Sequence, residues 1–160
     1  MRYMSKISII IPVKNESKNV EVLTNEILKY CSSLSYEIVF VNDGSVDETE
    51  KKLIKLKNKY KNLRVINHQV SFGQSAAIRS GVYYSKNEII VTMDGDCQND
   101  PEDILKMLKR FNNEKSSMLL IGGVRKVRKD SATKKLGSKF GKFCRKLFLN
   151  DDHPDSGCGI

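Results

Sequence analysis

Short apolar runs alternate along the chain with segments whose apolar residues recur every three or four positions. The runs are rich in β-branched residues and predict five strands, over residues 7–13, 36–41, 63–66, 88–93 and 118–124. The segments between them predict helices over residues 20–31, 47–60, 74–84 and 101–111. We expect Asp47 and Asp100 to cap the second and fourth helices, with Pro101 in the first position of the fourth.

Strands that alternate with helices of roughly 10 to 15 residues indicate an α/β fold, a doubly wound and mostly parallel sheet with helices on both faces. We expect residues 1–160 to form a single domain. In such sheets ligands bind beyond the carboxyl ends of the strands. Polar clusters follow three of the predicted strands, at residues 14–16, 42–45 and 94–96, so one crevice is expected to hold all three.

Asp94 and Asp96 stand at alternate positions after the predicted fourth strand. Carboxylate oxygens suit Mg²⁺ or Mn²⁺, which commonly keeps water ligands and is shared with substrate phosphates. Two aspartates at this spacing also occur by chance in solvated turns. The spacing alone therefore does not indicate a metal site, and the prediction depends on the position of the pair at a strand end. Asp43 has two interpretations as well: a turn residue that bonds its own backbone, or an acceptor for a base or ribose.

Several classes of protein are disfavoured by motifs that the sequence lacks. It has no glycine-rich dinucleotide fingerprint, no P-loop and no serine-hydrolase elbow. The four cysteines form no C-x-x-C pair, so neither a zinc site nor a disulfide framework is expected. His68 and His153 have no partner at ligand spacing and are interpreted as structural or exposed. A phosphorylation receiver domain would need an aspartate after the third strand, where Asn67 and His68 stand.

The lengths of the apolar runs and the composition of the N-terminus indicate the cellular compartment of the chain. No apolar stretch approaches the roughly 20 residues of a membrane-spanning helix. The first residues contain no long apolar segment and no small-residue cleavage site. We therefore expect the chain in the cytoplasm, with reduced thiols.

The net charge of +9 is concentrated in residues 125–146, which hold ten basic residues and one acid. Residues 131–149 predict a basic amphipathic helix, which either packs on its own sheet or lies on an anionic membrane surface. Arg125 opens this block just after the predicted fifth strand, where a guanidinium could hold a phosphate by paired hydrogen bonds. Binding of nucleic acid is not expected, because the block has no interleaved aromatic residues for base stacking.

Five segments in order carry a resemblance to a known family. They are IIIPVKNE at residues 9–16, VNDGSVDET at 41–49, FGQSAA at 72–77, DGDCQNDPE at 94–102 and GGVR at 122–125. Together they resemble the family 2 glycosyltransferases of GT-A fold. Within that family they are most similar to the polyprenyl-phosphate branch of dolichol-phosphate mannose synthase and the undecaprenyl-phosphate sugar transferases.

The resemblance implies roles for the residues at the strand ends. The nucleotide-sugar would be lined by Pro12, Lys14, Glu16, Val41, Asp43, Asp94 and Gly95. Asp96 and Gln98 would bind Mg²⁺ or Mn²⁺, and Asp96 and Arg125 would act in catalysis, Arg125 by holding a phosphate. Lys14 stands where the family commonly has an aromatic or small residue.

The implied reaction is inverting transfer of a sugar from a nucleotide-diphosphate donor to an undecaprenyl or dolichyl phosphate. Because the second pKa of a phosphate monoester is about 6, the acceptor is largely ionised at neutral pH and needs no dedicated protein base. The alternative is a soluble family 2 enzyme with a hydroxyl acceptor, which would require such a base. The resemblance also implies that the chain is the N-terminal part of a longer enzyme, peripheral at the inner face of the cytoplasmic membrane.

Overall fold

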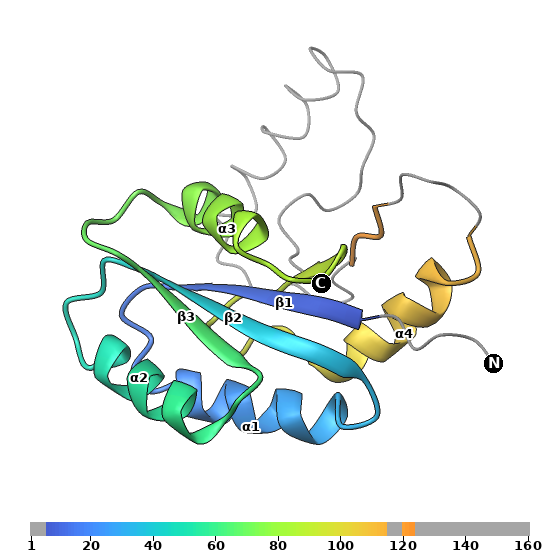
Figure 1. Ribbon diagram of the computed structural model, residues 1–160, viewed down its shortest axis with the longest axis horizontal. Coiled ribbons are helices and arrows are strands. Elements are labelled where there is room, and N and C mark those ends of the chain that lie inside the picture. The colour runs from blue at the N-terminus through green and yellow to red at the C-terminus, as the bar shows by residue number, and fades with distance from the viewer. Residues whose placement is uncertain (1–5, 115–119, 124–160) are drawn as a thin grey trace, which may run out of the picture. The chain divides into compact units, whose positions relative to one another are not determined.

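The computed structural model describes residues 6–114 and 120–123. Strands and helices alternate along residues 6–114, and all of them lie in one compact unit (Figure 1). Their bounds are β1 Lys6–Val13, α1 Val20–Tyr30, β2 Ser35–Asp43, α2 Thr49–Lys59, β3 Leu63–His68, α3 Gln74–Tyr83, β4 Ile89–Thr92 and α4 Glu102–Phe111.

The described strands form one parallel sheet in the order β3-β2-β1-β4. The chain runs outward from β1 through β2 to β3 and then returns to place β4 on the other side of β1. The direction of winding therefore reverses between β1 and β4. In open α/β sheets this reversal point is where ligands bind, beyond the carboxyl ends of the strands.

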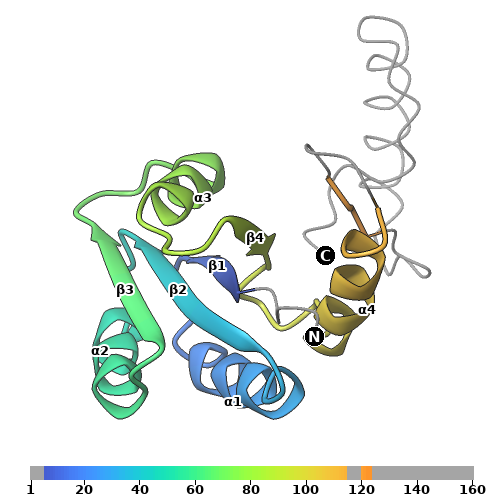
Figure 2. The same ribbon diagram turned by 45° about the vertical axis from the view of Figure 1, so that its right-hand side comes forward.

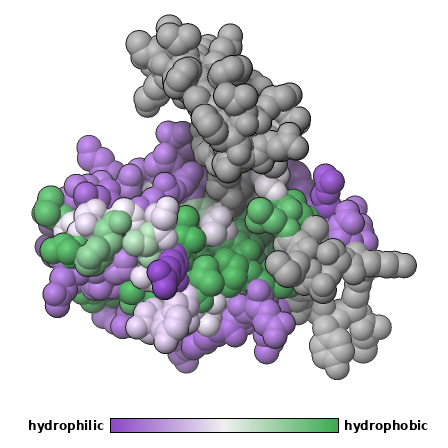
Figure 3. All heavy atoms as spheres, turned by 90° about the horizontal axis from the view of Figure 1, so that it is seen from above, coloured by the Kyte–Doolittle hydropathy of each residue, from purple (hydrophilic) through white to green (hydrophobic). Residues whose placement is uncertain are grey.

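Helices cover both faces of the sheet, because the inner strands are apolar on both sides. Along β1, Ile7, Ile9 and Ile11 belong to the larger core cluster, which α1, α2 and α4 cover, while Ile10 faces a smaller cluster under α3. Figures 1 and 2 show α1 and α2 on one face and α3 on the other. Figure 3 looks onto the side that carries α3, where apolar surface lies among polar surface.

The element types predicted over residues 7–111 are confirmed, with bounds that differ by one or two residues. The main difference is that β2 and β3 extend to Asp43 and His68, because these residues keep their parallel pairing to the end. Asp43 is therefore a strand residue and not part of the turn. Asp100 accepts the Glu102 N–H (2.9 Å), but the N-cap position of α4 is Pro101, one residue later than predicted.

Three predicted features fall partly or wholly outside the described residues. Residues 120–123 carry no strand, and the rest of the predicted strand 118–124 is outside the description. The predicted basic helix 131–149 and Arg125 also lie outside it. Within residues 6–114 and 120–123, no helix has the length and apolar character needed to span a bilayer.

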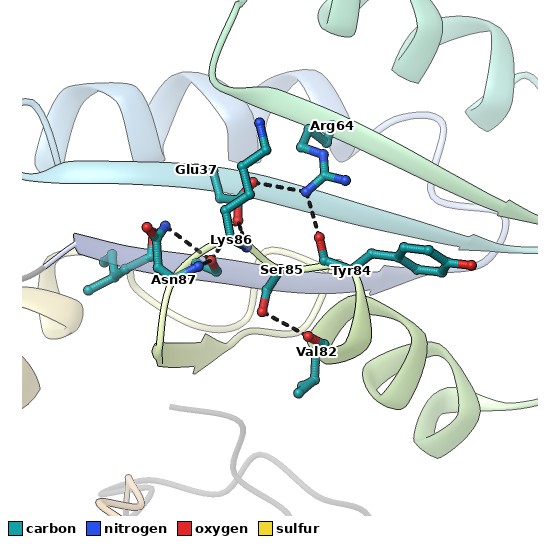
Figure 4. A network of polar contacts seen from close by, with 9 residues as sticks. Glu37, Arg64, Val82, Tyr84, Ser85, Lys86 and Asn87 are labelled. Carbon is teal, nitrogen blue, oxygen red and sulfur yellow. Dashed lines mark hydrogen bonds and ion pairs between the residues drawn. The ribbon is translucent and has the colours of Figure 1, made fainter.

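A buried polar network ties together the amino-terminal edge of the sheet (Figure 4). Glu37, which is 6% exposed, accepts hydrogen bonds from Ser8 Oγ (2.7 Å) and the Lys86 N–H (2.6 Å) and pairs with Arg64 (3.3 Å). Arg64 also donates to the Tyr84 carbonyl (2.6 Å). Burial raises the pKa of Glu37, but these hydrogen bonds outweigh it and lower that pKa below its ordinary value. The network joins β1, β2 and β3 to the connection between α3 and β4.

Candidate functional site

Four loops leave the carboxyl-terminal edge of the sheet, one after each described strand. Each loop contains one residue with a positive φ angle: Asn15 after β1, Gly44 after β2, Gly73 after β3 and Cys97 after β4. The described part of the chain has no others. A positive φ costs a residue other than glycine about 1–3 kcal/mol, and such backbone collects at functional sites. The positive φ angles of the described residues are thus gathered where the fold is expected to bind a ligand.

Asp43, at the end of β2, is 4% exposed and accepts four hydrogen bonds. Its Oδ1 accepts from His68 Nδ1 (2.7 Å) and the Phe72 N–H (2.9 Å), and its Oδ2 accepts from Ser71 Oγ (2.7 Å) and the Gly73 N–H (2.8 Å). A carboxylate has about four acceptor positions, so the protein itself occupies all of them. Asp43 therefore organises the loop between β3 and α3.

The same contacts set the charge of Asp43. Burial raises the pKa of this carboxyl, but the hydrogen bonds from Phe72, His68, Ser71 and Gly73 outweigh it and hold that pKa well below its usual range. The positive end of the α3 dipole, which begins at Gln74, acts in the same direction. Asp43 is thus a permanently charged anchor at neutral pH.

His68, at the end of β3, links Asp43 to α3. Since a carboxylate can only accept, Nδ1 carries the proton in the Asp43 contact, and in the neutral imidazole Nε2 accepts from Ser80 Oγ (2.9 Å). The imidazole is 12% exposed. Parallel pairing of β2 and β3 places His68 directly beside Asp43.

The loop between β3 and α3 also reaches the ends of β1 and β4. Ser71 Oγ, which donates to Asp43, accepts from Lys14 Nζ (3.1 Å). Gln74, the first residue of α3, donates from its side-chain amide to Asp94 Oδ1 (2.8 Å). Residues 71–74, named here the bridging loop, therefore connect Lys14 after β1, Asp43 at the end of β2 and Asp94 after β4.

Two glycines allow these loops to approach one another. A Cβ on Gly44 would lie 2.6 Å from the Ser71 nitrogen, and φ at Gly44 is +64°. A Cβ on Gly95 would lie 2.5 Å from Val13 Cγ1 and 3.0 Å from the Pro12 carbonyl oxygen. Gly44 brings the end of β2 against the bridging loop, and Gly95 brings the chain after β4 against β1.

Asp96 and Gln98 fit the cation that the resemblance implies. Both residues are exposed, and the positive φ of Cys97 turns the chain so that the Gln98 N–H donates to Asp96 Oδ1 (3.1 Å). A carboxylate and an amide oxygen are hard ligands of the kind that Mg²⁺ and Mn²⁺ prefer. The described residues contain no group of three His, Cys, Asp or Glu side chains that could hold a metal ion by themselves. A cation bound here would therefore take its remaining ligands from water and phosphate oxygens.

The other predicted site residues have different surroundings. Pro12 is partly buried in β1, and Glu16 accepts from the Asn19 side-chain amide (2.6 Å) just before α1. Val41 is fully buried and its side chain packs in the cluster under α3, so a contact with a nucleotide would come from its backbone. Arg125 lies outside the described residues.

Sequence reasoning missed the partners that hold the site together. The sequence indicates a structural or exposed His68, without these partners, and assigns no role to Ser71 or Gln74, although the last two lie in or beside a quoted motif. For His68 the signal was its place at the end of a strand next to the one that ends at Asp43. Neither spacing nor composition signals the contacts of Ser71 with Lys14 or of Gln74 with Asp94.

One family model and several relatives match this chain. The family described as "Glycosyl transferase family 2" matches residues 8–158. The dodecaprenyl-phosphate galacturonate synthase of Rhizobium johnstonii is 36% identical over 78% of this chain and 37% of its own length. The undecaprenyl-phosphate 4-deoxy-4-formamido-L-arabinose transferase of Salmonella choleraesuis is 32% identical over 97% of this chain and 47% of its own length. The chain thus spans less than half the length of these relatives.

Solved structures of glycosyltransferases share the fold. The mannosyltransferase PcManGT of Pyrobaculum calidifontis, solved with GDP-Man and Mn²⁺, superposes with a TM-score of 0.60 at 19% identity, over 71% of this chain and 34% of that one. TarS of S. aureus, solved with UDP-GlcNAc, has a TM-score of 0.55 at 26% identity, over 66% of this chain and 30% of that one. The predicted α/β fold of GT-A type is confirmed.

Proposed function

Because this chain belongs to glycosyl transferase family 2, we propose that it supplies the donor-binding part of an enzyme that moves a sugar from a nucleotide diphosphate to a polyprenyl phosphate. The observation that carries the proposal is the bridging loop, which connects Asp43, Lys14 and Asp94 beside the exposed Asp96. Two relatives, a dodecaprenyl-phosphate galacturonate synthase and an undecaprenyl-phosphate transferase, carry a polyprenyl phosphate in their names, which supports the choice of acceptor.

Within this site the nucleotide lies along the ends of β1 and β2, and the diphosphate lies towards the end of β4. Pro12, Lys14 and Glu16 line the nucleotide from β1, and Asp43 holds the loop that closes this side. Asp94 and Gly95 continue the pocket towards the diphosphate. The Lys14 ammonium lies 3.1 Å from Ser71 Oγ, which places a positive charge beside an otherwise acidic set of residues. Val41 supports the site by packing in the core cluster under α3.

A divalent cation held by Asp96 and Gln98 would neutralise charge on the departing nucleotide diphosphate. Arg125 would hold a phosphate of the donor or the acceptor. In the transfer, an acceptor phosphate oxygen forms a bond to the anomeric carbon as the bond from that carbon to the diphosphate breaks. The bonding electrons leave with the nucleotide diphosphate, and attack from the opposite side inverts the anomeric centre. An ionised acceptor phosphate makes this step without losing a proton to the protein.

The proposed acceptor and the basic residues 125–146 both support a location at a membrane. We propose peripheral binding at the inner face of the cytoplasmic membrane, where the basic block meets anionic headgroups. The nucleotide-sugar and the lipid phosphate would then meet at one surface.

Calorimetric titration with UDP, GDP, CDP and dTDP, each with Mn²⁺ and with EDTA, tests the donor site. We expect one nucleotide to bind, at least ten-fold more tightly with Mn²⁺, and Asp96→Asn to remove the metal dependence. Asp103→Asn removes from α4 an acid whose side chain is 49% exposed, and it serves as the matched control. No measurable binding of any of the four nucleotides to the wild-type chain would overturn the proposal. For the full-length enzyme, transfer to polyprenyl phosphate but not to hydroxyl acceptors is expected.

A further inference from the structure

Phe72 is a large apolar side chain on the surface of the candidate site. It is 65% exposed and lies in the bridging loop, between Ser71 and Gly73. Single exposed apolar residues are common on protein surfaces, so exposure alone assigns no role. The contacts that hold Phe72 in place are what distinguish it.

Phe72 is anchored through both its backbone and its ring. Its N–H donates to Asp43 Oδ1 (2.9 Å), and the N–H of Gly73 donates to Oδ2 of the same carboxylate (2.8 Å). Its ring meets the imidazole of His68 in an edge contact, with centroids 5.4 Å apart and planes at 77°. His68 is itself held between Asp43 and Ser80. An exposed ring held in this way loses little conformational freedom when a ligand packs on it.

The neighbours of Phe72 place it at the nucleotide end of the proposed site. Ser71, one residue before it, accepts from Lys14 after β1 (3.1 Å). Gln74, two residues after it, bonds Asp94 on the way to the proposed cation ligands (2.8 Å). The backbone of Phe72 thus lies beside Asp43, at the strand end where the proposed function puts the nucleotide, and its ring packs on His68 at the end of the neighbouring strand.

We propose that Phe72 is the stacking surface for the nucleobase of the donor. An aromatic ring stacks on any base, because every base has a π-face. Lys14, at the end of β1, offers no ring for this purpose. The inference rests on the proposed function and adds to it a residue that binds the base and no other part of the donor.

Binding of two ligands to three variants tests this assignment in the 160-residue chain. The ligands, both titrated with Mn²⁺, are the nucleoside diphosphate that the wild-type chain binds and inorganic pyrophosphate, which has no base. We expect Phe72→Ala to weaken nucleotide binding roughly ten-fold, within the range seen when stacking residues are replaced by alanine. Pyrophosphate binding should stay within about two-fold. Phe72→Tyr should restore nucleotide binding, and Phe72→Leu, which keeps apolar area but no ring, should not.

Tyr83→Ala is the matched control, because Tyr83 is 79% exposed at the other end of α3. It should bind both ligands as the wild-type chain does. Wild-type nucleotide affinity in Phe72→Ala would overturn this inference and leave the proposed function standing. An equal loss of nucleotide and pyrophosphate would also overturn it, since the ring would then serve only to fold the loop. A wild-type chain that binds pyrophosphate but no nucleotide would overturn the proposed function as well.

Discussion

Among single residues, Asp43 is a buried carboxylate whose pKa the surrounding hydrogen bonds hold well below its usual range. Its carboxylate accepts four hydrogen bonds while 4% exposed. The sequence indicates either a turn residue or a ligand acceptor at this position, because the preference of Asn-Asp-Gly-Ser for turns is local. What it could not supply was the return of residues 71–73 to the same point, which depends on the packing of β3 and α3.

Asp43→Asn should therefore destabilise the fold in a pH-dependent way. An asparagine offers one acceptor oxygen and presents an amide to donors that remain buried, which should cost about 2 kcal/mol at pH 7. Because the folded-state pKa of Asp43 is depressed, its stabilising contribution is complete above its unfolded pKa of about 3.9 and is lost as the pH falls below that value. Urea unfolding of both chains at pH 7 and pH 3 should show the difference shrink at pH 3. A pH-independent difference would contradict this electrostatic account.

His68→Phe should weaken the same anchor from the imidazole side. Phenylalanine keeps the ring but removes the donor to Asp43 and the acceptor for Ser80, which should cost about 1–3 kcal/mol. Ser80→Ala removes only the outer hydrogen bond and should cost less, about 0.5–1.5 kcal/mol. Thermal and urea unfolding of both variants measure which one loses more free energy of unfolding. Equal losses would mean that the contact with Asp43 is not the important one.

At the scale of elements, the alternation of strands and helices over residues 7–111 was predictable because each strand is a short β-branched run and each helix has a regular apolar stripe. The same pattern predicted that the polar ends of β1, β2 and β4 lie at one edge. It could not predict the bridging loop, since no periodicity marks the bonds from Ser71 to Asp43 or from Gln74 to Asp94. Val41 was assigned to the ligand pocket by resemblance alone, and its burial under α3 shows that its side chain serves the core.

Gly44→Ala should push the loop after β2 away from the loop between β3 and α3. The added Cβ would meet the backbone of Val70 and Ser71 at a residue whose φ is +64°, so the loops must move apart. We expect a loss of about 1–3 kcal/mol and weaker nucleotide binding. Glu37→Gln, at the opposite edge of the sheet, should lower stability while leaving nucleotide affinity unchanged. Calorimetry and urea unfolding of both variants separate the two effects, and an unchanged nucleotide affinity in Gly44→Ala would count against a role for this contact.

At the scale of the whole molecule, the excess positive charge lies in residues 125–146, and we expect it to bind anionic membranes. Each lysine or arginine near such a surface contributes about 1 kcal/mol, and salt screens the attraction. Replacing Lys134, Lys135, Lys139 and Lys142 with glutamine should abolish co-sedimentation with anionic vesicles at low salt. The same change at Lys51, Lys52, Lys55 and Lys57 of α2 alters the net charge equally and should leave binding intact. Equal losses in the two variants would indicate that net charge alone drives binding.

The proposed function requires the ends of β1, β2 and β4 to form one site for a cation and a nucleotide diphosphate. Paramagnetic broadening by Mn²⁺ in amide NMR spectra tests it most directly. With the nucleoside diphosphate present, Mn²⁺ should broaden the signals of Asp96 and Gln98 most strongly, followed by those of residues 71–74 and 43–45, and should spare the network around Glu37. Broadening confined to residues remote from Asp96, or unchanged signals from the bridging loop, would contradict the account.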